Sequence, residues 1–135
     1  MHRHGYKGRK FGRERDQRRA LIKGLATSLV EHGKVETTIE KAKDLRPYTE
    51  KLITKAKDGS LAKRREIIAA LNTKEAAHKL VDDIAPKLKR DSGYLRIKRT
   101  SLRRGDLAQL AEISFVDDLS APAPKPKAAA AKAGK

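Results

Sequence analysis

Apolar residues recur at helical spacing over the first two thirds of the chain, so this part is expected to be mainly helical. Apolar side chains three and four positions apart predict a first helix over residues 17–32. A second helix is expected to end before Asp58, with a kink or a break at Pro47, because proline removes one backbone donor. Two shorter helices should follow, the last stopping near Pro86. Four residues are the predicted N-caps, in chain order: Asp16, Thr37, Ser60 and Thr73.

The apolar period changes to two in the last third of the chain. Residues 94–100 and 109–116 alternate apolar and polar side chains, which predicts a hairpin whose loop, residues 101–108, is basic. Residues 34–38 predict a further short strand that could join this hairpin. The expected fold is therefore α+β, with about four helices packed on a small three-stranded mixed sheet.

The two ends of the chain differ in composition from the middle. Residues 1–15 place three glycines among basic side chains, so this segment is expected to be an extended arm. Residues 118–135 consist mostly of alanine, proline and lysine and are expected to be disordered. The folded α+β domain is then expected to span residues 16–117.

The basic residues are concentrated in two segments. The chain of 135 residues has 33 Lys and Arg against 17 Asp and Glu, a formal net charge of +16. Residues 1–19 carry +6 of this charge and residues 85–104 carry +7, so the other 96 residues carry only +3. Clustering of this kind is typical of a protein that binds a polyanion, because a merely soluble protein would scatter its charge.

The sequence lacks the residues that most catalytic and metal-binding sites require. The absence of cysteine excludes disulfide scaffolds, thiol nucleophiles and cysteine-ligated metals. No serine lies in a nucleophile elbow, and there is no glycine-rich phosphate loop. His2 and His4 could bind a transition metal, but no further ligand completes a set, so we interpret them as polar groups of a basic arm. We expect no enzyme activity, no cofactor, no metal site and no small-molecule substrate.

Membrane association is also not expected. No run reaches the ~18–20 apolar residues of a membrane span, and the basic first residues are not followed by the apolar stretch of a secretory signal. The first predicted helix has an ordinary core stripe rather than a wholly basic polar face. A cytoplasmic protein is the expectation.

Nucleic acid is the polyanion that the basic segments fit best. Lysine and arginine bind phosphates, and aromatic side chains between them can stack on unpaired bases. In the predicted hairpin, Tyr94, Arg96 and Lys98 are expected to share one exposed face. The candidate stacking residues are Tyr6, Phe11 and Tyr94. The candidate basic contacts are Arg3, His4, Lys7, Arg9, Lys10, Arg13, Arg15, Arg18, Arg19, Lys23, Arg96, Lys98, Arg99, Arg103 and Arg104.

Several short motifs follow one another in a characteristic order: VETT at 35–38, KAKDLRP at 41–47, EKLIT at 50–54, GY at 93–94 and RRGD at 103–106. Together with the arm, this order resembles the bacterial large-subunit ribosomal protein seventeen family, up to about residue 117. The resemblance implies an α+β domain that binds large-subunit ribosomal RNA near the peptide exit tunnel, beside other ribosomal proteins. It implies no enzyme activity.

A free nucleoid-type DNA-binding protein is the alternative interpretation. The Ala/Pro/Lys tail is similar in composition to linker-histone tails, and phosphate attraction serves both functions. The two differ in substrate shape, because a DNA compactor should bind plain duplex as well as it binds structured ribosomal RNA.

Overall fold

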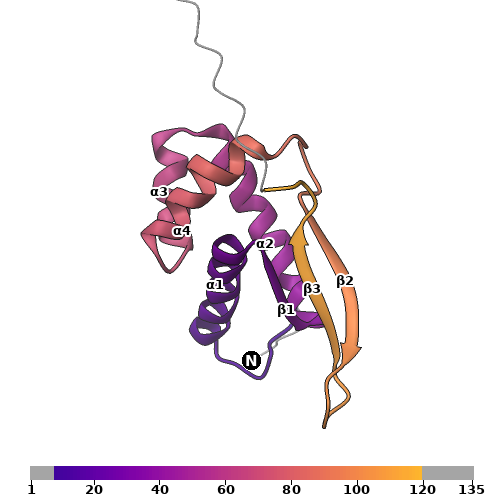
Figure 1. Ribbon diagram of the computed structural model, residues 1–135. Helices are drawn as coiled ribbons and strands as arrows, with labels where there is room; N and C mark the ends of the chain where they lie inside the picture. Colours follow the sequence, from indigo (N-terminus) through magenta and orange to yellow (C-terminus); the bar gives the residue numbers. More distant parts are fainter. Residues whose placement is uncertain (1–7, 120–135) are drawn as a thin grey trace, which may run out of the picture.

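The computed structural model describes residues 8–119, so residues 1–7 of the expected arm and 120–135 of the expected tail lie outside the described part. Within it, helices and strands confirm the expected α+β class (Figure 1). The elements in chain order are α1 (Arg15–His32), β1 (Lys34–Thr38), α2 (Ile39–Asp58), α3 (Leu61–Ala70), α4 (Lys74–His78), the π-helical η1 (Lys79–Ile84), the 3-10 turn η2 (Ala85–Lys87), β2 (Leu95–Leu102) and β3 (Gln109–Phe115).

The three strands form an antiparallel sheet in the order β1-β3-β2. Val35 of β1 and Ile97 of β2 both pair with Ile113 of the central strand β3. The expectation of a mixed sheet is wrong in this respect. The strands β1 and β2 do run in the same direction, but β3 lies between them, so no parallel pair forms.

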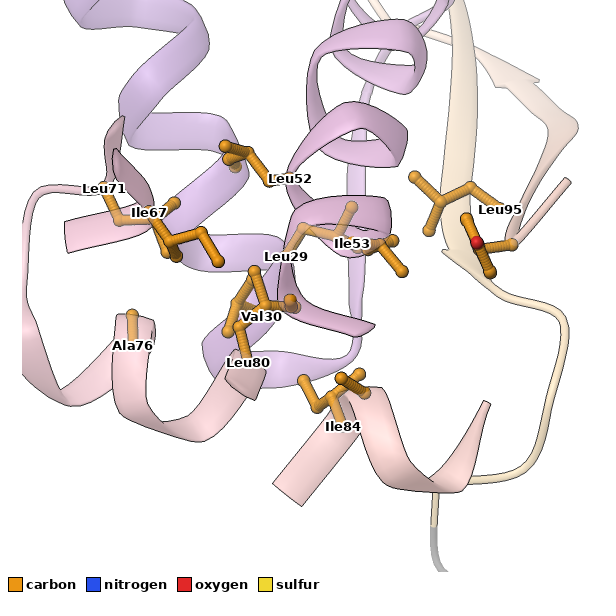
Figure 2. Close-up of a cluster of buried hydrophobic side chains, with 14 of the residues drawn as sticks. Leu29, Val30, Leu52, Ile53, Ile67, Leu71, Ala76, Leu80, Ile84 and Leu95 are labelled. Atoms are coloured by element: carbon orange, nitrogen blue, oxygen red, sulfur yellow. The ribbon is translucent and has the colours of Figure 1, made fainter. Parts of the chain in front are cut away.

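The core lies between one face of the sheet and the helices, with α2 in the middle. Helix α2 contacts α1 and α3 on one side and β2 and β3 on the other. Leu29, Leu80 and Ile53 of α2 are fully buried and belong to the same cluster of apolar side chains (Figure 2). Ile113 brings the sheet into the same core. Although the chain has few apolar residues, they form one hydrophobic core around α2, its longest helix.

Helix α2 runs without a break through Pro47, so of the two expected outcomes, a kink or a break, the break is wrong. Proline at this position removes the bond to the carbonyl of Lys43, four residues earlier. Both residues are exposed, so water can satisfy that carbonyl and the helix continues. Two predicted caps are also displaced. The N-caps are Glu14 and Thr38 instead of Asp16 and Thr37, and neither side chain caps its helix.

The predicted third and fourth caps are confirmed, because the hydroxyls of Ser60 and Thr73 accept backbone hydrogen bonds at the starts of α3 and α4. The expected fourth helix changes geometry after His78, widening into η1 and then tightening into η2. Leu80, Val81 and Ile84 of η1 are buried. The helical periodicity of the sequence does not predict this change of helix geometry.

Candidate nucleic-acid interface

The described part of the arm is fixed to the start of α2 by Arg9. Its guanidinium donates a 2.6 Å hydrogen bond to Asp44 Oδ1 and forms an ion pair with Glu40. The bond to Asp44 raises the pKa of Arg9, and a hydrogen bond from Lys43, together with Arg9, lowers the pKa of Glu40. Arg9, a predicted phosphate ligand, is therefore neutralised by two carboxylates in the free protein. It anchors the arm.

A tight turn follows the anchor. The backbone N–H of Arg13 donates to the carbonyl of Lys10 at 3.1 Å, and the two residues between them have positive φ, 54° at Phe11 and 60° at Gly12. Two successive positive φ values occur in type I′ turns, where glycine is favoured. The guanidinium of Arg13 also donates to the carbonyl of Phe11 at 2.9 Å. The turn holds Phe11 in a conformation that bulky residues rarely adopt.

The hairpin loop is ordered by a second internal ion pair. Arg103 Nε donates to Asp106 Oδ1 at 3.0 Å, and its other nitrogen reaches Asp106 Oδ2. These bonds, with one from the backbone of Ala108, lower the pKa of Asp106 to about 2. The neighbouring Arg104 is exposed and has no ion pair within residues 8–119. Of the two predicted loop contacts, both are exposed, but Arg103 already pairs with Asp106 whereas Arg104 does not pair with a described carboxylate.

The arm and the hairpin loop lie at the same end of the molecule, the end at which α2 begins (Figure 1). Arg9 holds the arm on the first turns of α2. Thr38, just before α2, pairs with Leu110, so the loop that precedes Leu110 extends beyond this end of the sheet. Two basic segments far apart in sequence are thereby brought to one surface.

Tyr94 is not part of that surface, so its predicted place on an exposed face is wrong. Its side chain is 2% exposed, and its hydroxyl donates to the carbonyl of Asp91 at 2.7 Å. Strand β2 begins only at Leu95, so the alternation does not extend back to Tyr94. Lys57 lies over the ring, with its Nζ 5.5 Å from the centroid. Tyr94 therefore packs in the core and is closed to a nucleobase.

The exposed face of the sheet is less basic than the sequence of β2 indicates. Lys98 pairs directly with Glu112, which in turn pairs with Glu36 on β1. Arg96 lies on this face, whereas the register places Arg99 on the helix side, opposite Ala111, where it is still exposed. Two carboxylates from the other strands therefore share this face with its cations, although the ion pair that Glu112 forms is with Lys34.

The basic segment 85–104 is divided between the two ends of the sheet. Lys87 donates to the carbonyl of Leu119 at 2.8 Å, and Arg90 pairs with Asp117 at 3.4 Å. Both lie before β2, away from the hairpin loop. Four predicted contacts lie on α1: Arg15, Arg18, Arg19 and Lys23. Four others lie outside the described residues: Arg3, His4, Tyr6 and Lys7.

A groove that sequence reasoning missed lies between the arm, α1 and α2. It has a volume of about 630 Å³ and is lined by Phe11, Arg19 and Lys23, which were predicted, and by Ile22 and Tyr48, which were not. The two missed residues follow the apolar stripes of their helices, so the sequence assigns them to the core. Ile22 and Tyr48 line a groove only because the arm lies against α1 and α2 in the folded protein.

Between residues 8 and 119, no three His, Asp or Glu side chains lie close enough together to hold a metal ion. None of the helices in this part of the chain combines the length and apolar character required to cross a bilayer.

Comparison with known proteins identifies the family. A family model described as ribosomal protein L17 matches residues 21–116. The chain is 54% identical over 116 residues to the large ribosomal subunit protein bL17 of Helicobacter pylori (strain Shi470), covering 85% of this chain and 98% of that protein. Identity and coverage are the same for bL17 of Sulfurimonas denitrificans, and identity is 53% for bL17 of Helicobacter acinonychis. The chain belongs to the ribosomal protein L17 family.

Proposed function

We propose that this protein is a structural constituent of the large ribosomal subunit and binds large-subunit ribosomal RNA with the end of the molecule at which α2 begins. Family membership supports the place in the large subunit. The observation that supports this RNA-binding surface is that the arm and the hairpin loop converge at that end. A position near the peptide exit tunnel, beside other ribosomal proteins of the cytoplasmic ribosome, is part of the proposal and rests on the sequence resemblance.

In this proposal the protein holds segments of RNA in position and catalyses no reaction. Arg104, Arg19 and Arg15 are exposed cations at or near this end, and each phosphate they neutralise releases counterions. The helical body keeps the arm and the loop at a fixed separation, so the protein recognises the spacing of phosphates in a folded RNA. The ion pairs of Arg9 and Arg103 order the two segments before RNA arrives, which reduces the entropy lost on binding.

Sedimentation and competition test this proposal. A tagged chain expressed in a bacterium should migrate with the large subunit through moderate-salt washes. Its presence in the free pool alone would refute the ribosomal assignment. In a separate assay, large-subunit ribosomal RNA should displace the bound protein more effectively than an equal mass of duplex DNA. Equal displacement would favour the nucleoid-type alternative.

A further inference from the structure

The groove between the arm, α1 and α2 combines apolar walls with cations. Phe11 from the arm, Ile22 from α1 and Tyr48 from α2 supply apolar surface. The hydroxyl of Tyr48 donates to the carbonyl of Ala70 at 2.7 Å, which fixes the orientation of its ring. The volume of about 630 Å³ lies in the usual range of sites for small organic groups. The groove therefore has the size and surface to take one planar ring system.

Cations on α1 border the same groove. Arg19 is exposed and has no ion pair among the described residues, and Lys23 donates one hydrogen bond, to the carbonyl of Ala69 at 3.0 Å. The acidic group in the lining, Asp44, is occupied by Arg9. An occupant should therefore bring negative charge beside an apolar ring.

The strained position of Phe11 is a second feature of the groove. A phenylalanine with a φ of 54° is uncommon, and such conformations cluster where chains clamp ligands. Arg13 holds the turn through the carbonyl of Phe11. The side chain is half-buried, so part of the ring remains open to the groove.

We propose that this groove receives a single unstacked nucleotide of RNA, with its base against Phe11 and Tyr48 and its phosphate on Arg19. This inference rests on the proposed function and assigns it a specific binding site. Stacking on aromatic side chains beside phosphate-binding arginines is how proteins hold unpaired RNA bases. Residues 1–7 of the chain are the competing occupant. Their sequence, MHRHGYK, has two permanently charged cations and no carboxylate, so it is electrostatically mismatched to this groove.

Substitution of Phe11 by glycine tests the site without disturbing the turn, because glycine accepts a positive φ more readily than phenylalanine. With a transcript of large-subunit ribosomal RNA as the probe, Phe11→Gly should bind about 5–150-fold more weakly, the range for loss of one base stack. The salt dependence of binding should not change, because no charge is lost. Phe11→Trp, which keeps an aromatic face, should bind about as well as the wild type.

Two further variants separate stacking from charge. Arg19→Ala should lower the salt slope by about one phosphate contact. Leu61→Ala removes an exposed apolar side chain far from the groove and should bind like the wild type. In a transcript carrying 4-thiouridine, ultraviolet cross-links should map to the peptides that contain Phe11 or Tyr48.

The outcomes distinguish this inference from the proposed function. If the wild type binds the transcript but Phe11→Gly binds equally well, the groove assignment is wrong and the proposed function stands. If the wild type does not prefer the transcript to duplex DNA, the proposed function itself fails. Nuclear Overhauser effects between the Phe11 ring and residues 1–7 that persist in the RNA complex would show that the chain fills its own groove, and would overturn the proposal.

Discussion

The backbone N–H of Asn72 donates a 3.1 Å hydrogen bond to the hydroxyl of Thr27, although the two residues are 45 positions apart. The same hydroxyl donates to the carbonyl of Lys23, one turn earlier in α1, at 2.9 Å. Thr27 is 5% exposed, so its hydroxyl joins α1 from a buried position to the segment after α3, where Asn72 is exposed. The groove lies close to this link, because it is lined by Lys23 of α1, one turn before Thr27, and by Ala69 near the end of α3.

Thr27→Val is expected to lower the free energy of unfolding by roughly 1 kcal/mol more than Thr49→Val does, because Thr27 makes one additional hydrogen bond, from Asn72. Thr49→Val is the matched control, because Thr49 is also buried but its hydroxyl donates only within α2, to Leu45 at 3.1 Å. Urea unfolding monitored by circular dichroism should show the larger loss for Thr27→Val. Equal losses would mean that the bond to Asn72 adds no stability.

Leu29→Ala should destabilise the protein by ~2–5 kcal/mol, because Leu29 is fully buried and its removal leaves a cavity. Leu25 lies on the same apolar stripe but is only half-buried, so Leu25→Ala should cost less. The sequence stripe alone predicts the full ~2–5 kcal/mol for Leu25 as well. Urea midpoints at a constant m-value will decide between the two expectations.

Removing both carboxylates that hold Arg9 (Glu40→Gln with Asp44→Asn) should release the arm from α2. Trypsin is then expected to cleave after Lys10 and Arg13 severalfold faster, as followed by mass spectrometry, while the helical body stays intact. The control is Glu75→Gln with Asp83→Asn, which removes two exposed carboxylates on α4 and η1. Unchanged cleavage in the first variant would show that these ion pairs do not fix the arm.

Arg104→Ala should lower the slope of log K against log salt for ribosomal RNA by about 0.7–0.9, the value of one phosphate contact. Arg103→Ala should change the slope less, because Arg103 already pairs with Asp106 in the free protein. Lys74→Ala, an exposed cation on α4, is the control and should leave the slope unchanged. A larger effect at Arg103 than at Arg104 would show that RNA breaks the internal pair.

The hairpin loop should resist acid. The pKa of Asp106 falls to about 2 from 3.8, chiefly through its hydrogen bonds from Arg103, so the carboxylate supports the loop above pH 3.8. That support is lost as the pH falls toward 2. Carbon-detected NMR should give Asp106 a titration midpoint near pH 2 in the wild type and a higher one in Arg103→Ala, still below 3.8 because the backbone of Ala108 continues to donate to the carboxylate. Arg104→Ala should leave the midpoint unchanged.

Local chemistry explains which features were predictable. The helical stripe of α1, the caps Ser60 and Thr73 and the alternation in β3 depend on neighbouring residues, so the pattern of the chain indicates them directly. The continuity of α2 through Pro47 and the burial of Tyr94 depend on which side faces water, and that is set by packing between distant segments. The expected break at Pro47 and the expected exposure of Tyr94 were therefore wrong.

The sequence by itself determined the class of fold, the family and the two basic segments, because periodicity, motif order and charge are properties of the chain. Only the tertiary structure decided which cations remain available. Arg9 pairs with Asp44 and Arg103 pairs with Asp106, whereas Arg104 has no ion pair within residues 8–119. Electrostatic interactions depend on distance in space, so a segment that is basic in sequence becomes a binding surface only where folding brings no carboxylate beside it.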